Sequence, residues 1–233
     1  SLKILLKKIR GTFYFAIEIS PTTYTKNSQL FKNTFLATLR NNTLNITNDI
    51  YNLLGMANSL LLWHKDNLFC GKCGSRNITS DNGHSRICTN NTCDTKIFPR
   101  INPAVIMLIT YKDKCLLGRQ ENWPKKMVSA LAGFTEHGES IEETVKRETF
   151  EEVGIKVNNI KYQHSQPWPF PYNLMLGFRA NALQIKLKIN YQELENASWY
   201  KKEQLLKLIN TDYIRLPNKI SIAYRLITEW LEE

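Results

Sequence analysis

The sequence lacks any apolar run long enough to cross a bilayer. The longest runs, "PAVIMLIT" at 103–110 and "SLLLW" at 59–63, are far shorter than the roughly 20 residues that a spanning helix needs. The first ten residues, "SLKILLKKIR", lack the long uncharged segment and the cleavage pattern of a secretory signal. We therefore expect no membrane association. A cytoplasmic location is expected because reduced thiolates of the cysteine pairs at 70–93 fit the cytosol, and a mitochondrial location is the alternative because this start is basic.

Internal repeats and low-complexity linkers are also missing, and acidic residues are few. The 233 residues carry 31 Lys and Arg against 21 Asp and Glu, a net charge of +10, with 42% hydrophobic residues. That balance is typical of a folded chain with one large domain or two smaller ones. The positive charge favours phosphate-rich substrates or nucleic acid, and a solvated basic surface is the alternative.

Cysteine is scarce, and four of the five cysteines fall in one short window, as "CGKC" (Cys70, Cys73) and "CTNNTC" (Cys88, Cys93). Two close pairs with a short spacer are typical of a tetrahedral zinc site. Two disulfides or a redox dithiol are alternatives, but the missing secretory features favour zinc. A closed four-thiolate site has no open position for substrate, so this zinc is expected to be structural. Cys115 is expected to be a buried strand residue.

The cysteine window divides the chain into three predicted domains. Residues 1–62 predict a small N-terminal α+β domain that ends in a helix, residues 63–98 a zinc ribbon, and residues 99–233 an α/β domain. In the last, the patterns predict two strands joined by a turn at 112–114, a helix over 140–153 and two C-terminal helices. Further strands are predicted near 155–163, 174–180 and 183–189.

Three prolines alternate with Trp168 and Phe170 in "SQPWPFPYNLM" at 165–175. Proline removes backbone donors and fixes φ, so this stretch excludes a helix and a central strand. We expect a rigid extended loop that presents aromatic faces to a ligand. A plug in the hydrophobic core is the alternative for these two aromatic side chains.

The helix predicted at 140–153 combines a capping box with a stripe of carboxylates. Ser140 and Glu143 have the spacing of a capping box. Val145, Glu148 and Glu152 follow one another at helical spacing, so the core-facing stripe passes from aliphatic side chains to carboxylates. Clustered carboxylates need a cation, and their hard oxygens suit Mg²⁺ or Mn²⁺. A solvated acidic face paired with basic neighbours is the alternative.

The full run "GFTEHGESIEETVKRETFEEVGI", Gly133 to Ile155, resembles the signature of the Nudix hydrolases. A glycine, five residues, Glu139, seven residues, then the "RE" and "EE" pairs and Gly154 stand at the family's spacing, and Thr149 replaces a usual bulky aliphatic residue. The resemblance implies an α/β/α sandwich with a mixed sheet and hydrolysis of a nucleoside diphosphate linked to another group. The catalytic residues that it implies are Glu148, Glu151, Glu152 and Arg147, with the three glutamates and the Ala132 carbonyl as ligands of Mg²⁺ or Mn²⁺.

Together with the cysteine ribbon and the proline-rich loop, this signature is similar to that of the NADH pyrophosphatase subfamily. The similarity runs from about Leu60 to the end and includes "FPRINPAVIM", "ASWY" and "IAYRLI". It implies a homodimer that cleaves NADH or NAD⁺ to nicotinamide mononucleotide and AMP, with NAD-capped RNA as a further substrate. The alternatives are another substrate such as ADP-ribose, or a catalytically impaired nucleotide- or RNA-binding module.

The same similarity implies a nicotinamide pocket. Phe134 and Trp168 are expected to stack on the ring, and Phe98 to close the pocket from the other subunit. The remaining expected substrate contacts are Gln166, Pro167, Pro169, Phe170, Pro171, Tyr172, Asn173 and Ala223.

Two positions depart from the subfamily pattern. Asn173 stands where a serine is usual and keeps a polar side chain. Asn196 stands where a further metal-binding glutamate is expected, with Glu195 one residue earlier. Asparagine can coordinate through its carbonyl but carries no charge, whereas a one-residue bulge would bring Glu195 into place. The sequence leaves both alternatives open, and of the two residues we name Glu195 as the predicted metal ligand.

Overall fold

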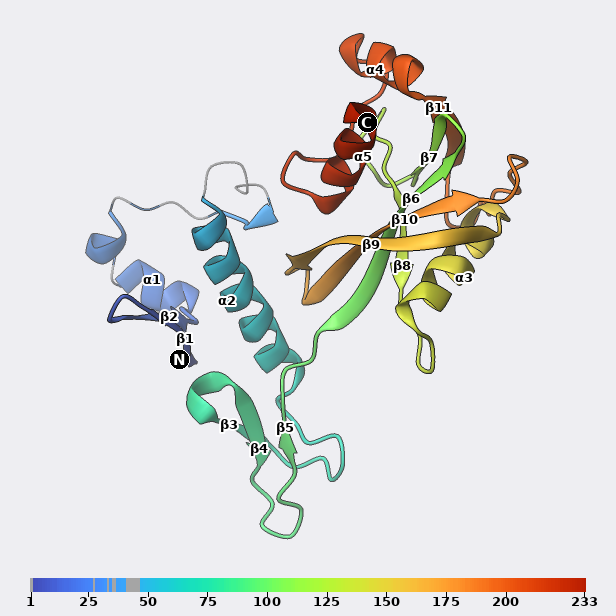
Figure 1. Ribbon diagram of the computed structural model, residues 1–233. Coiled ribbons are helices and arrows are strands. Elements are labelled where there is room, and N and C mark those ends of the chain that lie inside the picture. The colour runs from blue at the N-terminus through green and yellow to red at the C-terminus, as the bar shows by residue number, and fades with distance from the viewer. Residues whose placement is uncertain (1, 27, 33, 35–36, 41–46) are drawn as a thin grey trace. The chain divides into compact units, whose positions relative to one another are not determined.

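The computed structural model of the chain describes residues 2–26, 28–32, 34, 37–40 and 47–233 (Figure 1). Its contacts divide into two compact units. Unit 1 comprises Ser1–Ile101 and Pro167–Tyr172, and unit 2 comprises Asn102–Gln166 and Asn173–Glu233. The finer division of unit 1 near residue 62 stays a prediction, and residues 41–46 of that predicted domain lie outside the described residues.

Unit 1 begins with an antiparallel hairpin of β1 (Lys3–Ile9) and β2 (Thr12–Ile17). The short helices α1 (Pro21–Lys26) and η1 (Ser28–Phe31) follow, and then the long helix α2 (Asn48–Asp66). Ile4, Leu6 and Ala16 of the hairpin form a small core with Leu60 of α2. Alternating side chains of the strands therefore bury one face of the hairpin.

A three-stranded ribbon completes unit 1. Its strands are β3 (Asn77–Ser80), β4 (Ser85–Cys88) and β5 (Lys96–Ile97), and the single turn η3 (Asp81–Gly83) joins the first two. His64 of α2 is fully buried, donates from Nε2 to the Gly83 carbonyl (2.9 Å) and accepts at Nδ1 from Arg86 (2.9 Å). Burial, together with the charge of Arg86, lowers the pKa of His64, so the ring that links α2 to the ribbon is neutral.

Unit 2 is built on a mixed six-stranded sheet in the order β11-β7-β6-β10-β9, with β8 paired to β6. The strand β6 runs parallel to β10 and antiparallel to β7 and β8. The bounds are β6 (Asn102–Tyr111), β7 (Lys114–Arg119), β8 (Leu131–Phe134), β9 (Val157–Trp168), β10 (Asn173–Ala182) and β11 (Asn196–Lys201).

Helices cover both faces of this sheet (Figure 1). On β6, Val105 and Met107 pack on the side of α3 (Ile141–Val153), whereas Ile106 and Leu108 pack on the side of α4 (Lys202–Asn210) and α5 (Ile222–Glu232). Because β6 is buried on both faces, nearly all of its residues are apolar, which explains the continuous apolar run "PAVIMLIT". The predicted α/β/α sandwich with a mixed sheet is confirmed, and Cys115 is a buried residue of β7 as expected.

Two local predictions were wrong. Residues 183–189 form no strand. The backbone N–H of Leu183 donates to Lys156 O (2.9 Å), just before β9, and that of Lys188 donates to Val153 O (2.8 Å), at the end of α3. These donors are therefore not part of a strand ladder. The predicted loop at 165–175 is shorter, because β9 continues to Trp168 and β10 begins at Asn173. An edge strand tolerates Pro167, since one side of its backbone needs no ladder partner.

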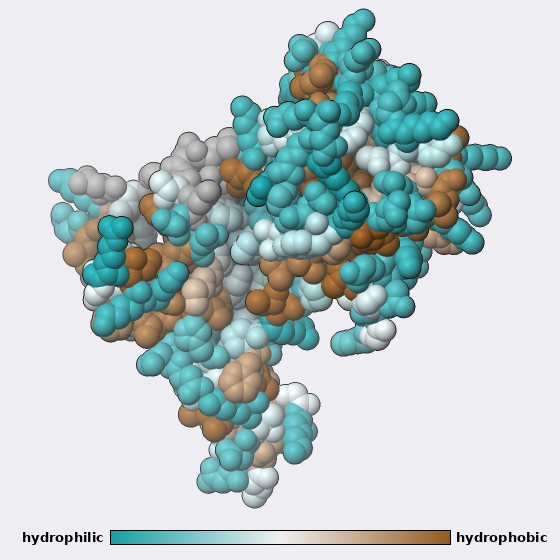
Figure 2. All heavy atoms as spheres, viewed as in Figure 1, coloured by the Kyte–Doolittle hydropathy of each residue, from teal (hydrophilic) through white to brown (hydrophobic). Residues whose placement is uncertain are grey.

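Among the residues that the structure describes, no helix is both long and apolar enough to cross a membrane. Hydrophilic residues predominate on the face of unit 2 seen in Figure 2. The apolar side chains of this unit are collected instead in the two layers on either side of its sheet.

Candidate active site

Helix α3 is fixed at both ends by its own sequence. The Ser140 hydroxyl accepts from the Glu143 N–H (3.2 Å), and the Glu143 carboxylate accepts from the Ser140 N–H (2.7 Å), which confirms the capping box. Gly154 ends the helix in a left-handed conformation with φ of 70°. A Cβ at Gly154 would lie 2.7 Å from the Lys188 Cβ, so glycine is required there for its space as well as its backbone.

The predicted stripe on α3 faces the core. Val145 is fully buried and Glu152 is only 3% exposed, while Glu148 is half-buried. Burial, followed by the charge of Glu148, raises the pKa of Glu152 to about 8, and burial likewise raises the pKa of Glu148. The Oε2 atom of Glu152 is buried with no hydrogen-bond partner, which is costly for an oxygen that could carry charge.

Gly133 on β8 makes room for the Glu148 carboxylate. A Cβ built on Gly133 would lie 1.9 Å from Glu148 Cδ and 2.1 Å from each of its carboxylate oxygens. The Glu148 side chain therefore packs directly against the β8 backbone, one residue from Ala132. Sequence reasoning did not assign Gly133 a role, although its place at the start of the signature could have suggested one.

Arg147 forms hydrogen bonds with three carboxylates on α3 and in the loop before it. Its Nε donates to Glu139 Oε1 (2.5 Å), its Nη1 donates to Glu148 (2.9 Å) and Glu151 (2.8 Å), and its Nη2 donates to the Phe134 carbonyl (2.8 Å). The planar guanidinium can bridge three carboxylates because its donors form a rigid fork. The Arg147 hydrogen bond lowers the pKa of Glu139 to about 2, so at neutral pH Glu139 is an anion that pairs with the arginine.

These residues fit a divalent cation. Carboxylate oxygens are hard ligands of the kind that Mg²⁺ and Mn²⁺ prefer, and the buried, unpartnered Oε2 of Glu152 lacks a positive partner. In the described part of the chain, the cysteine sulfurs are the one group of His, Cys, Asp and Glu ligand atoms that gathers within 4.8 Å. The glutamates are less tightly gathered, and Arg147 is paired with Glu148 and Glu151.

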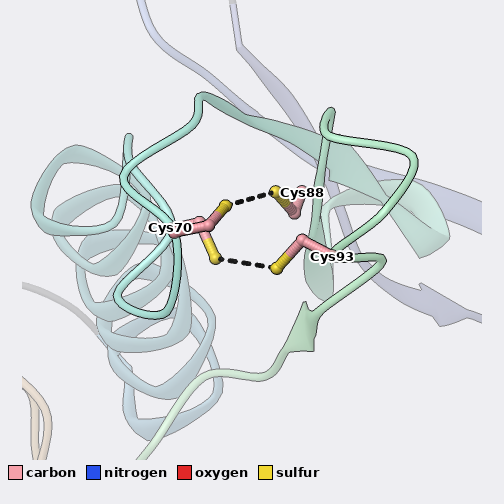
Figure 3. Close-up of side chains that lie close together, drawn as sticks. Cys70, Cys88 and Cys93 are labelled. Atoms are coloured by element: carbon pink, nitrogen blue, oxygen red, sulfur yellow. Dashed lines mark hydrogen bonds between the residues drawn. The ribbon is translucent and has the colours of Figure 1, made fainter.

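The four cysteine sulfurs of unit 1 form a compact cluster. Cys70 Sγ lies 3.8 Å from Cys93 Sγ (Figure 3). Cys73 Sγ lies 3.5 Å from Cys88 Sγ. These separations suit a tetrahedral ion with bonds of about 2.3 Å. Hydrogen bonding by Ser75 lowers the pKa of Cys73 to about 6. The pKa of Cys88 moves the other way, because a hydrogen bond from Asn90 is outweighed by burial and the neighbouring cysteines, which raise this pKa to about 12. No disulfide joins these cysteines.

The proline-rich loop is hydrogen-bonded to α2 within unit 1. The Asn58 side chain donates to the Pro169 carbonyl (2.8 Å), and the Ser59 hydroxyl donates to the Pro171 carbonyl (3.0 Å). Pro169 is buried, whereas Trp168 and Phe170 are half-buried and meet edge to face at 5.3 Å. Sequence reasoning missed these two α2 residues, because nothing local links them to a loop more than a hundred residues away.

The other predicted contact residues have varied surroundings. Phe134 in unit 2 is 55% exposed, and Phe98 in unit 1 is 63% exposed. Gln166 donates to Ile220 O (2.6 Å) and accepts from Ile222 N (2.8 Å), so its amide joins β9 to the start of α5. Ala223 is buried in the α5 layer, and Asn173 accepts from Asn102 (3.4 Å). Their roles as substrate contacts stay predictions.

Glu195 and Asn196, the two candidates for the last metal ligand, are both exposed at the start of β11. The Glu195 carboxylate is paired with Arg119 Nε at 2.6 Å. Asn196 lies opposite Arg119 in the β11–β7 register.

Comparison with known families assigns most of the chain. The NUDIX domain family matches residues 100–218, just over half of the sequence, and the "NADH pyrophosphatase zinc ribbon domain" matches residues 65–98. The second match, together with the cysteine cluster, supports structural zinc.

Two curated relatives and one solved structure illustrate the similarity. Nudix hydrolase 19, chloroplastic, of Arabidopsis thaliana is 43% identical over 73% of the chain, and the NAD-capped RNA hydrolase NUDT12 of Homo sapiens is 37% identical over 77%. The aligned chain spans 41% of the length of each relative. A crystal structure of a NUDIX hydrolase from Nitrosomonas europaea aligns with a TM-score of 0.55 at 20% identity, over 71% of this chain and 90% of that one, which supports the fold. The chain therefore belongs to the Nudix family, and its Nudix domain follows a zinc ribbon of the NADH pyrophosphatase type.

Proposed function

We propose that this chain hydrolyses the pyrophosphate bond of NADH or NAD⁺ to nicotinamide mononucleotide and AMP. The observation that carries the proposal is the α3 site, in which Arg147 fixes Glu148 and Glu151 beside the buried Glu152. The relatives' names support the nucleotide: one is called an NAD-capped RNA hydrolase, and the matched ribbon is named for NADH pyrophosphatases. The reaction adds water across one P–O–P bond and leaves a phosphate on each mononucleotide.

In this proposal Glu148, Glu151 and Glu152 hold Mg²⁺ or Mn²⁺, together with the carbonyl of Ala132. A bound divalent cation would supply charge neutralisation for the pyrophosphate and a lowered pKa for bound water. Arg147 keeps two of the carboxylates in place through its fork of donors. Burial raises the pKa of Glu152 to about 8, and a bound divalent cation would favour its ionised form.

The proline-rich loop is proposed to bind the nicotinamide nucleotide. Trp168 and Phe170 offer aromatic faces, and hydrogen bonds from α2 hold the loop carbonyls. A pre-ordered wall binds more tightly because less loop entropy is lost on binding. We assign Phe134 and Trp168 to the ring, and Phe98 to the neighbouring subunit of a homodimer.

NAD-capped RNA is a second proposed substrate. The net charge of +10 and the name of the human relative both favour it. The thiolates of the zinc site favour a reducing compartment such as the cytoplasm.

Incubation of the purified chain with NADH and Mn²⁺, followed by chromatographic separation of the products, tests the proposal. Reduced nicotinamide mononucleotide and AMP in equal amounts are expected, and Glu152→Gln should abolish both. Hydrolysis of ADP-ribose in preference to NADH would point to the alternative substrate class. Binding of NADH without turnover would point to a binding module.

A further inference from the structure

The β1–β2 hairpin of unit 1 leaves one face uncovered, and this face is aromatic. Phe13, Phe15 and Ile17 of β2 are 52%, 44% and 52% exposed, whereas Ala16 between them is buried in the small core with α2. Alternate residues of a strand point to opposite faces, so one side of the hairpin packs on α2 and the other meets solvent. Large apolar side chains that are exposed side by side mark an interaction surface.

A bulge in β1 determines which side chains share this outer face. The register shifts between Leu5 and Lys7, so that Leu5 lies opposite Phe15 and Lys8 lies opposite Phe13. In a regular strand, residues 5 and 8 would point to opposite faces, and the extra residue of the bulge brings them to the same one. We call Lys3, Leu5, Lys8, Phe13, Phe15 and Ile17 the outer hairpin face.

Each phenyl ring of the outer hairpin face has an ammonium group beside it. Lys3 Nζ lies 4.1 Å from the centroid of the Phe15 ring, and Lys8 Nζ lies 4.9 Å from that of Phe13. Residues 3–17 include four Lys and Arg and no Asp or Glu. An exposed cation–π contact is weak, and the long lysine stem lets the ammonium move to a neighbouring anion. The face therefore combines flat apolar rings with mobile positive charge.

Single-stranded RNA has the complementary chemistry. Its bases are planar and stack on aromatic side chains, and its phosphates pair with lysine. Phe13 and Phe15 are two residues apart, so their rings are spaced by about 7 Å along the strand, enough for one base on each. A lipid surface offers phosphates but no planar groups for the rings. An apolar protein partner would bury two ammonium groups without an opposite charge, which is costly.

Helix α2 supports both this hairpin and the proline-rich loop. Leu60 packs with the inner side of the hairpin, and the two preceding residues, Asn58 and Ser59, donate to loop carbonyls (Figure 1). Both features thus belong to unit 1 and are held by adjacent residues of one helix. We propose that the outer hairpin face binds single-stranded RNA, with bases stacked on the two phenyl rings and phosphates paired with the two lysines. This inference rests on the proposed function only in taking the RNA that follows an NAD cap as the natural ligand.

Fluorescence anisotropy with uncapped single-stranded RNA of about 12 nucleotides tests the assignment on the full chain, with zinc retained and no Mn²⁺ added. The double variant Phe13→Leu, Phe15→Leu keeps apolar side chains but loses the rings, and should weaken binding about 10-fold with an unchanged salt dependence. The double variant Lys3→Gln, Lys8→Gln should also weaken binding about 10-fold. In this variant the slope of log Kd against log salt concentration should fall by about 2.

A pair of exposed lysines in unit 2 provides the matched control. The double variant Lys112→Gln, Lys156→Gln removes the same charge and should bind RNA as the parent does. Thermal midpoints and zinc contents equal to those of the parent show that all three variants are folded.

Three results would overturn the assignment. One is RNA binding by the phenylalanine variant at the parent's affinity, and another is an equal loss in the lysine control. The third is retained RNA binding by both hairpin variants together with lost binding to vesicles of phosphatidylcholine and phosphatidylserine, which would assign the face to lipid. Because the RNA carries no cap, absence of NADH turnover in the parent would refute the proposed substrate and leave the RNA result standing.

Discussion

The carboxylate of Glu148 lies where the Cβ atom of any other residue at position 133 would be, so only Gly133 leaves room for it. An ideal Cβ on Gly133 would lie 1.9 Å from Glu148 Cδ. Close packing against Glu148 therefore explains why a glycine stands at the start of the Nudix signature in this chain. It lets the Glu148 carboxylate approach the backbone of β8 beside Ala132.

Gly133→Ala should displace Glu148 and lower kcat/KM for NADH by about 100-fold, because small misplacements of catalytic groups cost that much. The expected loss is measured by product formation with saturating Mn²⁺. Gly71→Ala is the control, since no atom lies within 4 Å of its added Cβ. Full activity in Gly133→Ala would mean that Glu148 works from another position.

Arg147→Lys retains a positive charge but loses the fork that joins Glu139, Glu148 and Glu151. We expect kcat/KM to fall about 10- to 100-fold, in the range seen when a group that orients metal ligands is removed. Lys146→Ala, an exposed neighbour on the same helix, should leave activity unchanged. An Arg147→Lys variant as active as the parent would show that charge alone suffices.

Glu152→Gln should stabilise the metal-free protein at alkaline pH. Burial raises the pKa of Glu152 from the ordinary 4.5 to about 8, so its contribution to stability is fully present below 4.5 and is lost as the pH rises through about 8. The amide carries no such charge, and we expect about 2 kcal/mol more unfolding free energy at about pH 9. Urea unfolding of both proteins, with a chelator present to remove the divalent cation, measures this difference in unfolding free energy. Equal stability of the two proteins at that pH would contradict the burial of this carboxyl.

Asn58→Ala should loosen the proline-rich loop without touching the metal site. Loss of the 2.8 Å bond to Pro169 O is expected to raise KM for NADH about 5-fold, as for one hydrogen bond, with little change in kcat. Asn52→Ala, an exposed position on the same helix, is the control. A fall in kcat with unchanged KM would place the role of Asn58 elsewhere.

Removal of zinc should unfold the ribbon of unit 1. The purified chain is expected to hold about one zinc ion, and Cys73→Ser should lose it, since the other three thiolates cannot close a tetrahedral site. Cys115→Ala should keep its zinc, because this thiol is buried in β7. Metal analysis of both variants provides the check, and zinc retained by Cys73→Ser would exclude the four-cysteine site.

Local features of the site could be predicted from the sequence because neighbouring residues determine them. The capping box of Ser140 and Glu143 and the buried stripe through Val145 and Glu152 depend only on helical spacing, and both are present. The alternation of apolar residues at 183–189 also suggested a strand, but those backbone donors bond to Lys156 and the end of α3 instead.

Features that depend on distant contacts could not be predicted. The hydrogen bond from Asn58 to the proline-rich loop and the hydrogen bond from Asn190 N to Glu152 O each join segments that are separated in the chain by other helices or strands.

The most direct test of the central claim is hydrolysis of NADH in ¹⁸O-labelled water, with mass spectrometry of the products. The account predicts that the label enters a phosphate of reduced nicotinamide mononucleotide or AMP, and that Glu148→Gln loses this product. Release of free nicotinamide with unlabelled phosphates, or no turnover with Mn²⁺ and zinc both present, would contradict it.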